Sequence, residues 1–312
     1  MRDYSAEEMQ RFVEAIDSLM ADTESAVYRY FMRFGPLLPG DAREAALIDA
    51  MMMLVEKYGD AVAWLTVDWL DLAYVPRAED RPSMKMLHDA ATEALATATA
   101  PDRELMAEAI RKACRFVGTS KGARAAAGKQ AAAYAAAEAK RRGYTLIDRT
   151  IALADADARQ LGMSPLGLQV IWQPRGAHTC AFCTMVASNG WRVASKDVLS
   201  EYIGHVHDNC HCTLIFKPAD AAVGGVTPKK YLDRLYSVIE TDEDGKEYVT
   251  TADGRRIPHY RIDGKVSSGY WEEVTLALRR KDYAEPEEHA RILAQQRAQY
   301  ARTHPKEDKQ DE

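Results

Sequence analysis

Residues 123–139 read ARAAAGKQAAAYAAAEA, a run dominated by alanine. We predict a helix from Ser120 to Arg142 around this run, and its small side chains suit close packing in a core or against another subunit. The charged residues Arg124, Lys129 and Glu138 interrupt the run. No window, this run included, approaches the roughly 20 uninterrupted apolar residues that a membrane span needs. We therefore expect a soluble protein with no membrane partner.

The residues before this run carry the signals of further amphipathic helices. Ser5 and Glu8 form a capping box, and apolar residues then recur at i, i+3, i+4 and i+7 as far as Phe31, before Gly35-Pro36 ends the pattern. The same periodicity predicts further helices over residues 41–58, 62–74, 84–98, 101–117 and 146–161. The chain is therefore expected to begin with a long helical region.

Glycine and proline are expected to mark the limits of these helices. Gly59 predicts a break within the second helical segment, Gly118 and Gly143 predict helix ends, and Pro101 suits a first-turn position.

The pattern changes after Gly162. Residues 167–172 and 213–216 are short runs typical of β-strands, a helix is expected from Pro228, and Asp-Gly pairs at 244, 253 and 263 suit tight turns between strands. We predict an α+β fold in which a mainly α-helical N-terminal domain is followed by a small zinc-stabilised α+β unit and a C-terminal extension. The expected divisions are a helical domain at 1–161, a Cys/His zinc-binding unit at 162–226, a helix with short strands at 227–283, and a polar tail at 284–312.

The cysteines are few but clustered. Five cysteines in 312 residues are too few for a disulfide-dense secreted scaffold, and the polar N-terminus shows no signal peptide, so a reducing compartment is expected. Four of the five cysteines and four of the eight histidines lie within residues 178–212. Such clustering is typical of a local site.

The spacing of these residues predicts a structural zinc site. The pattern is Cys180-x2-Cys183, then 23 residues, then His207-x2-Cys210-x-Cys212. Zinc takes four thiolate or imidazole ligands, and any four of these five residues satisfy it; four protein ligands close the site to substrate. His178, His205 and His211 are candidates for hydrogen bonds to the ligands. The alternatives are buried cysteines, a disulfide, or a CxxC redox pair.

The cysteine-rich segment also resembles a known family. Residues 172–190 and 205–213 are similar to the corresponding segment of the Mu F-like minor capsid proteins, which are head-morphogenesis proteins of tailed bacteriophages, here of the actinobacteriophage type. The matching positions are Cys180, Cys183, Gly190, His207, Cys210 and Cys212. The resemblance implies a low-copy virion protein in the capsid interior or at the portal vertex, present in the host cytoplasm during assembly. Its implied partners are the portal and/or the major capsid protein.

The net charge of −6 is unevenly distributed. Residues 111–149 contain ten Lys and Arg against two acids, a charge of +8 that leaves −14 for the rest of the chain. This basic stretch has two interpretations: contacts with packaged DNA, or the solvated faces of two helices. The candidate DNA contacts are Arg111, Lys112, Arg115, Lys121, Arg124, Lys129, Lys140, Arg141 and Arg142.

These features together predict a structural and interaction protein. We name no catalytic residue, because the sequence lacks GxSxG, Walker and HExxH motifs. The alternative is a zinc-dependent nuclease or a hydrolase or protease that acts during head maturation, with His205 or His211 activating water beside the metal.

Overall fold

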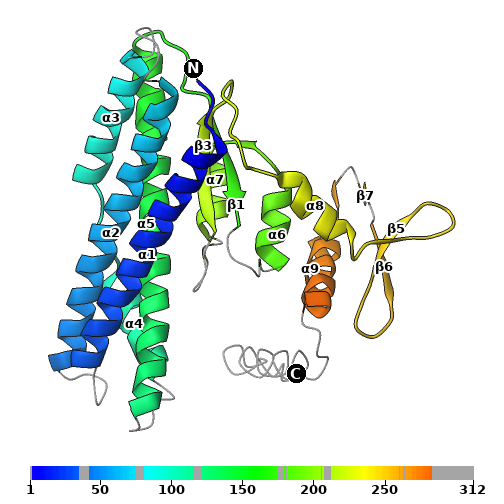
Figure 1. Ribbon diagram of the computed structural model, residues 1–312, viewed down its shortest axis with the longest axis horizontal. Helices are drawn as coiled ribbons and strands as arrows, with labels where there is room; N and C mark the ends of the chain where they lie inside the picture. The colour runs from blue at the N-terminus through cyan, green and yellow to red at the C-terminus, as the bar shows by residue number, and fades with distance from the viewer. Residues whose placement is uncertain are drawn as a thin grey trace, which may run out of the picture. The chain divides into compact units, whose positions relative to one another are not determined.

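Figure 1 shows the computed structural model of the chain. The structure describes residues 2–34, 42–74, 81–114, 121–174, 179, 181–204, 206, 212–259, 261–262, 265–266 and 268–282. These residues are mostly helical and include small antiparallel sheets, which confirms the predicted α+β class with a mainly helical N-terminal region.

The chain divides into two compact units. Unit 1 contains residues 1–177 and 189–227, and unit 2 contains residues 178–188 and 228–312. The division after Thr227 lies next to the boundary expected at 226. The short helix α6 (Ala181–Ser188) groups with unit 2, although the sequence assigned it to the segment 162–226.

Unit 1 is built around the alanine-rich helix. Its helices are α1 (Ala6–Phe34), α2 (Ala42–Tyr74), α3 (Arg81–Ala96), α4 (Arg103–Cys114), α5 (Lys121–Gln160) and α7 (Lys196–Gly204). Helix α5 packs against each of the others, and the long helices lie side by side in Figure 1. Seven alanines between residues 131 and 139 are buried, on all sides of the helix. A helix buried all round needs small side chains where neighbours approach closely, and this confirms the close packing expected of the alanine-rich run.

Two glycines expected to interrupt helices lie inside them, so those predictions were wrong. Helix α2 continues through Gly59 and α5 continues through Gly143. A Cβ at Gly143 would lie 2.5 Å from Val62 Cβ and 2.9 Å from the Gly59 carbonyl oxygen, and a Cβ at Gly59 would lie 2.9 Å from the Ala139 carbonyl oxygen. These glycines allow the two longest helices to cross closely, and burial of the surrounding apolar side chains offsets their low helix propensity.

At the start of a helix the first backbone N–H groups have no partner within the helix, and nearby side chains accept their hydrogen bonds in α1 and α4. At α1, Ser5 Oγ accepts from Glu8 N at 3.1 Å and Glu8 Oε2 accepts from Ser5 N at 2.9 Å, which confirms the capping box. At α4, Asp102 Oδ1 accepts from Glu104 N at 2.8 Å and from Leu105 N at 3.2 Å. Asp102 is the N-cap, so Pro101 precedes the helix and does not occupy its first turn.

A small antiparallel sheet completes unit 1. Its strands are β1 (Leu168–Gln173), β2 (Arg192–Val193) and β3 (Thr213–Pro218), in the order β2-β1-β3. The two strands predicted from sequence are thus confirmed. Strand β3 is buried along its whole length, and α2 packs against it: Trp69 Nε1 donates to the Phe216 carbonyl oxygen at 2.6 Å.

Unit 2 contains three helices and five short strands among its described residues. These are α6, α8 (Pro228–Tyr236), β4 (Glu240–Thr241), β5 (Glu247–Thr250), β6 (Arg256–Pro258), β7 (Arg261–Ile262), β8 (Lys265–Val266) and α9 (Ser268–Asp282). Its core includes Ala181, Leu235, Val249, Tyr270, Val274 and Leu278.

The turns of unit 2 bear out two of the three Asp-Gly predictions. Gly245 and Gly254 have φ values of +78° and +82° in the turns before and after β5, where residues with a Cβ are strained. The pair Asp263-Gly264 and the predicted tail at 284–312 lie outside the described residues.

Candidate functional site

Two of the five predicted zinc ligands lie in the described part of the chain. Cys183 is in the first turn of α6 in unit 2 and is 2% exposed; Cys212 directly precedes β3 in unit 1 and is 5% exposed. Cys180, His207 and Cys210 lie outside the described residues, as do His178, His205 and His211. Within the described ranges, no group of three or more His, Cys, Asp or Glu side chains is arranged to hold a metal ion.

Cys212 directly precedes strand β3, and helix α5 holds this part of the backbone in place. Lys140 on α5 is 1% exposed and its Nζ donates to the Cys212 carbonyl oxygen at 3.1 Å. One turn further along α5, the buried Tyr144 hydroxyl accepts from Leu214 N at 2.9 Å. The central helix therefore fixes the backbone on both sides of Thr213.

Cys183 lies on a helix whose apolar side faces the core of unit 2. Ala181 belongs to that core, and Arg234 on α8 donates to Thr184 Oγ1 at 3.2 Å. Helix α6 is buried on most sides because its residues are small or apolar; residues 181–187 read Ala-Phe-Cys-Thr-Met-Val-Ala.

The fifth cysteine is separate from the cluster. Cys114 ends α4 and is half-buried. Desolvation raises the pKa of its thiol, and the nearby Glu44 carboxylate raises it further. A thiol of this kind remains protonated near neutral pH, which makes it a poor nucleophile.

The basic stretch divides into internal and exposed residues. Besides Lys140, Arg141 donates to Glu138 and to the Val206 carbonyl oxygen, and Arg142 donates to Asp60 at 2.8 Å. Arg111 bonds Glu104 and Glu44 at 2.9 and 3.2 Å, and the Glu104 hydrogen bond raises the pKa of Arg111.

The other candidates for DNA contact are less engaged. Lys112 and Lys129 are exposed and Arg124 is half-buried, whereas Arg115 and the side chain of Lys121 lie outside the described residues. Four of the nine candidates for DNA contact, Arg111, Lys140, Arg141 and Arg142, thus bind other groups within the protein.

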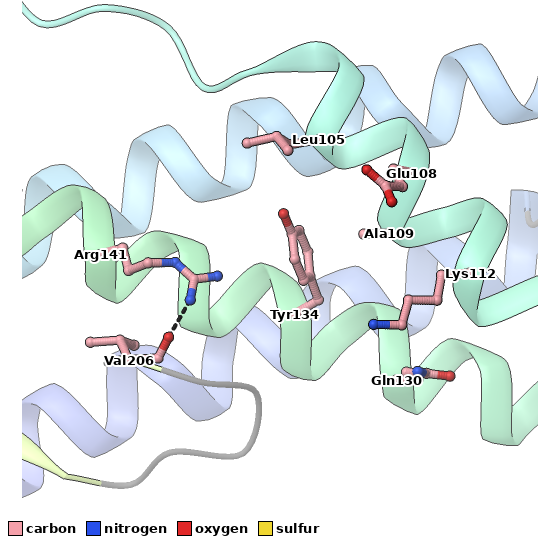
Figure 2. A pocket seen from close by; sticks show the side chains of 8 residues that line it. All are labelled: Leu105, Glu108, Ala109, Lys112, Gln130, Tyr134, Arg141 and Val206. Carbon is pink, nitrogen blue, oxygen red and sulfur yellow. Dashed lines mark hydrogen bonds between the residues drawn. The ribbon is translucent and has the colours of Figure 1, made fainter. Parts of the chain in front are cut away.

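A groove between α4 and α5 is lined in part by residues of the basic stretch. It has a volume of about 540 Å³. Figure 2 shows its lining, in which Tyr134 stands between Arg141 and Lys112 and points toward α4. The lining residues are Leu105, Glu108, Ala109, Lys112, Gln130, Tyr134, Arg141 and Val206.

The sequence of α4 contains a signal for this groove beside the stripe of its buried residues. Helix α4 buries Met106, Ala107, Ile110 and Ala113, one complete i, i+1, i+4, i+7 stripe. The groove residues 105, 108, 109 and 112 form a second stripe beside it. Because this stripe mixes apolar and charged residues, it resembles an ordinary solvated face.

Comparison with known proteins identifies the family. The model of the family described as VG15 protein, a phage protein family, matches residues 3–238. This match covers all of unit 1 except its first two residues, and it extends over α6 and α8 of unit 2. No curated protein and no solved structure matches the chain significantly.

None of the described helices combines the length and the apolar character that a membrane-spanning helix needs.

The family match spans the helical bundle, the small sheet and the cysteine-rich segment together, which is about three quarters of the chain. The chain belongs to the VG15 family of phage proteins.

Proposed function

We propose that this chain is a minor capsid protein of a tailed phage, a structural component that acts in head morphogenesis near the portal vertex. The observation that carries the proposal is the family match over residues 3–238. It includes the cysteine-rich segment, whose residues resemble those of Mu F-like minor capsid proteins. The architecture of unit 1 supports a structural role, because Lys140, Arg141 and Arg142 of the central helix bind other segments of the unit.

The cysteine-rich segment would contribute a structural zinc site to this protein. The chemistry of the donor set suits zinc, since thiolates and imidazole are its preferred ligands. Four of Cys180, Cys183, His207, Cys210 and Cys212 would hold the ion. Burial of Cys183 and Cys212 agrees with a closed structural site, in which the metal stabilises the fold and takes no substrate.

A stop codon at the Trp64 position of the phage gene tests the proposed function. We expect infected cells to replicate phage DNA but to yield no infectious heads, and a plasmid copy of the gene should restore them. Normal yields of infectious particles without the protein would refute a role in head morphogenesis.

Two assays on the purified chain test the zinc site and the enzyme alternative. Elemental analysis should find about one zinc per chain, less in Cys212→Ser, and unchanged zinc in the control Cys114→Ser. A wild-type protein without zinc would remove the metal site. Cleavage of phage DNA or capsid protein that is lost in His211→Ala would favour the nuclease or hydrolase alternative over a structural role.

A further inference from the structure

Two neighbouring hollows on unit 1, which together are called the long groove below, share part of their lining. The cavity between α4 and α5 shares Leu105 and Arg141 with a second hollow of about 360 Å³. One stripe of α5 lines both hollows, at residues 130, 134, 138, 141, 145 and 149. At 1.5 Å per residue the stripe is about 28 Å long, the length of a helix of about five turns.

The lining suits a peptide better than a nucleic acid. Leu105 is 46% exposed, and Ala109 and Ile203 add apolar surface along the two hollows. Glu108 places a carboxylate within the first hollow. A DNA backbone has no apolar face to cover Leu105. An amphipathic helix covers such a groove with its apolar face.

An exposed cation lies near each end of the long groove, and among the described residues Glu108 is the one carboxylate beside Lys112 in the first hollow. Arg141 is engaged by Glu138, and Asp102 caps α4. Lys112 and Arg149 are both exposed, and neither forms an ion pair with any carboxylate that the structure describes; Arg149 donates to the Thr97 carbonyl oxygen at 3.0 Å. The complementary occupant therefore carries carboxylates spaced to face these two cations.

We propose that the long groove formed by the two hollows binds an amphipathic, acidic helical segment of a partner protein, with its apolar face on Leu105 and its carboxylates at Lys112 and Arg149. This inference deepens the proposed function, on which it rests: it identifies the surface through which an assembly protein would recognise another component of the head. Electrostatic pairs at the ends of the groove would set the register of the bound helix.

Photocrosslinking in infected cells tests the docking site. The full-length chain carries p-benzoylphenylalanine at Leu105 or, as a control, at Leu161, which is 68% exposed and lines neither hollow. We expect a protein adduct from position 105 but not from 161. Mass spectrometry of the adduct should locate one segment with apolar residues at helical spacing and at least two carboxylates.

Charge reversal makes the test specific. The double variant Lys112→Glu, Arg149→Glu should reduce the yield of the adduct at least fivefold. The control Lys129→Glu, at an exposed site outside both hollows, should leave the yield unchanged. Glu→Lys changes in the captured segment should restore the yield in the double variant. No adduct specific to position 105, an adduct with DNA or with a second copy, or an adduct indifferent to charge reversal would each overturn the proposal. Recovery of the chain in purified heads reports separately on the proposed function.

Discussion

Replacement of Gly143 by alanine tests whether α5 is the close-packed centre of unit 1. The added Cβ would lie 2.5 Å from both Cβ and Cγ1 of Val62 and 2.9 Å from the Gly59 carbonyl oxygen. Backbone atoms and the β-branched side chain of Val62 can move only slightly to make room for the new Cβ. We therefore expect overpacking to lower the free energy of unfolding by about 3 kcal/mol, at the upper end of the usual range of about 1–3 kcal/mol. Alanine regains about 1 kcal/mol of helix propensity. The net loss is therefore about 2 kcal/mol.

Gly→Ala changes at two other glycines of α5, Gly122 and Gly128, serve as controls for the change at Gly143. A Cβ at Gly122 meets nothing within 4 Å, so Gly122→Ala should be neutral or stabilising by up to about 1 kcal/mol. A Cβ at Gly128 lies 3.1 Å from side-chain atoms of Phe31 and Tyr28, which can shift, so Gly128→Ala should fall between the other two.

Urea unfolding of the full chain, followed by circular dichroism at 222 nm, measures this series. Thermal unfolding should show Gly143→Ala melting about 4–8 °C below the wild type. If Gly143→Ala were as stable as Gly122→Ala, the close crossing of α2 and α5 would be wrong, and with it the explanation for the two glycines inside long helices.

Two further predictions concern the start of α1 and the anchoring of β3. The Ser5 backbone N–H and the Arg2 guanidinium lower the pKa of Glu8, so the stability it adds is present above the unfolded pKa of 4.5 and is lost as pH falls through the lower folded value. Glu8→Gln should thus cost about 1 kcal/mol at pH 7 and progressively less as the pH of the urea titrations is lowered below 4.5, and an equal cost at every pH would contradict the assignment. Tyr144→Phe removes the acceptor of the buried Leu214 N–H and should cost about 1–3 kcal/mol, whereas Tyr236→Phe, at a 49% exposed site, should cost little; equal melting temperatures for the two variants would contradict this role of Tyr144.

The helical half of unit 1 was predictable because its signals are local. The capping box at Ser5 and the apolar spacing through Phe31 depend on residues three or four apart, and both appear in α1 as expected. The two main strands were equally evident, since each is a short apolar run bounded by turn residues.

The roles of the glycines were not predictable from local pattern. A glycine that ends a helix and a glycine that admits a neighbouring helix look the same in sequence, and the difference at Gly143 depends on Val62, which is 81 residues away. The same holds for Lys140. Its charge counted toward a basic surface, but its position on the central helix buries it against the strand that follows Cys212.

The grouping of α6 also depends on contacts that sequence spacing does not reveal. Ala181 packs with Leu235 and Val274, so the CxxC half of the predicted zinc motif and the Cys212 half lie in different units of the chain. Their spacing predicts a metal site through chemistry alone, and that prediction remains to be measured.

Quantitative mass spectrometry of purified heads, from the phage that encodes this chain, tests the proposed function most directly. A minor capsid protein should remain with the heads through gradient purification, at a low and constant ratio to the portal protein. Absence of the chain from heads, with all of it recovered in the unassembled fraction, would contradict the account.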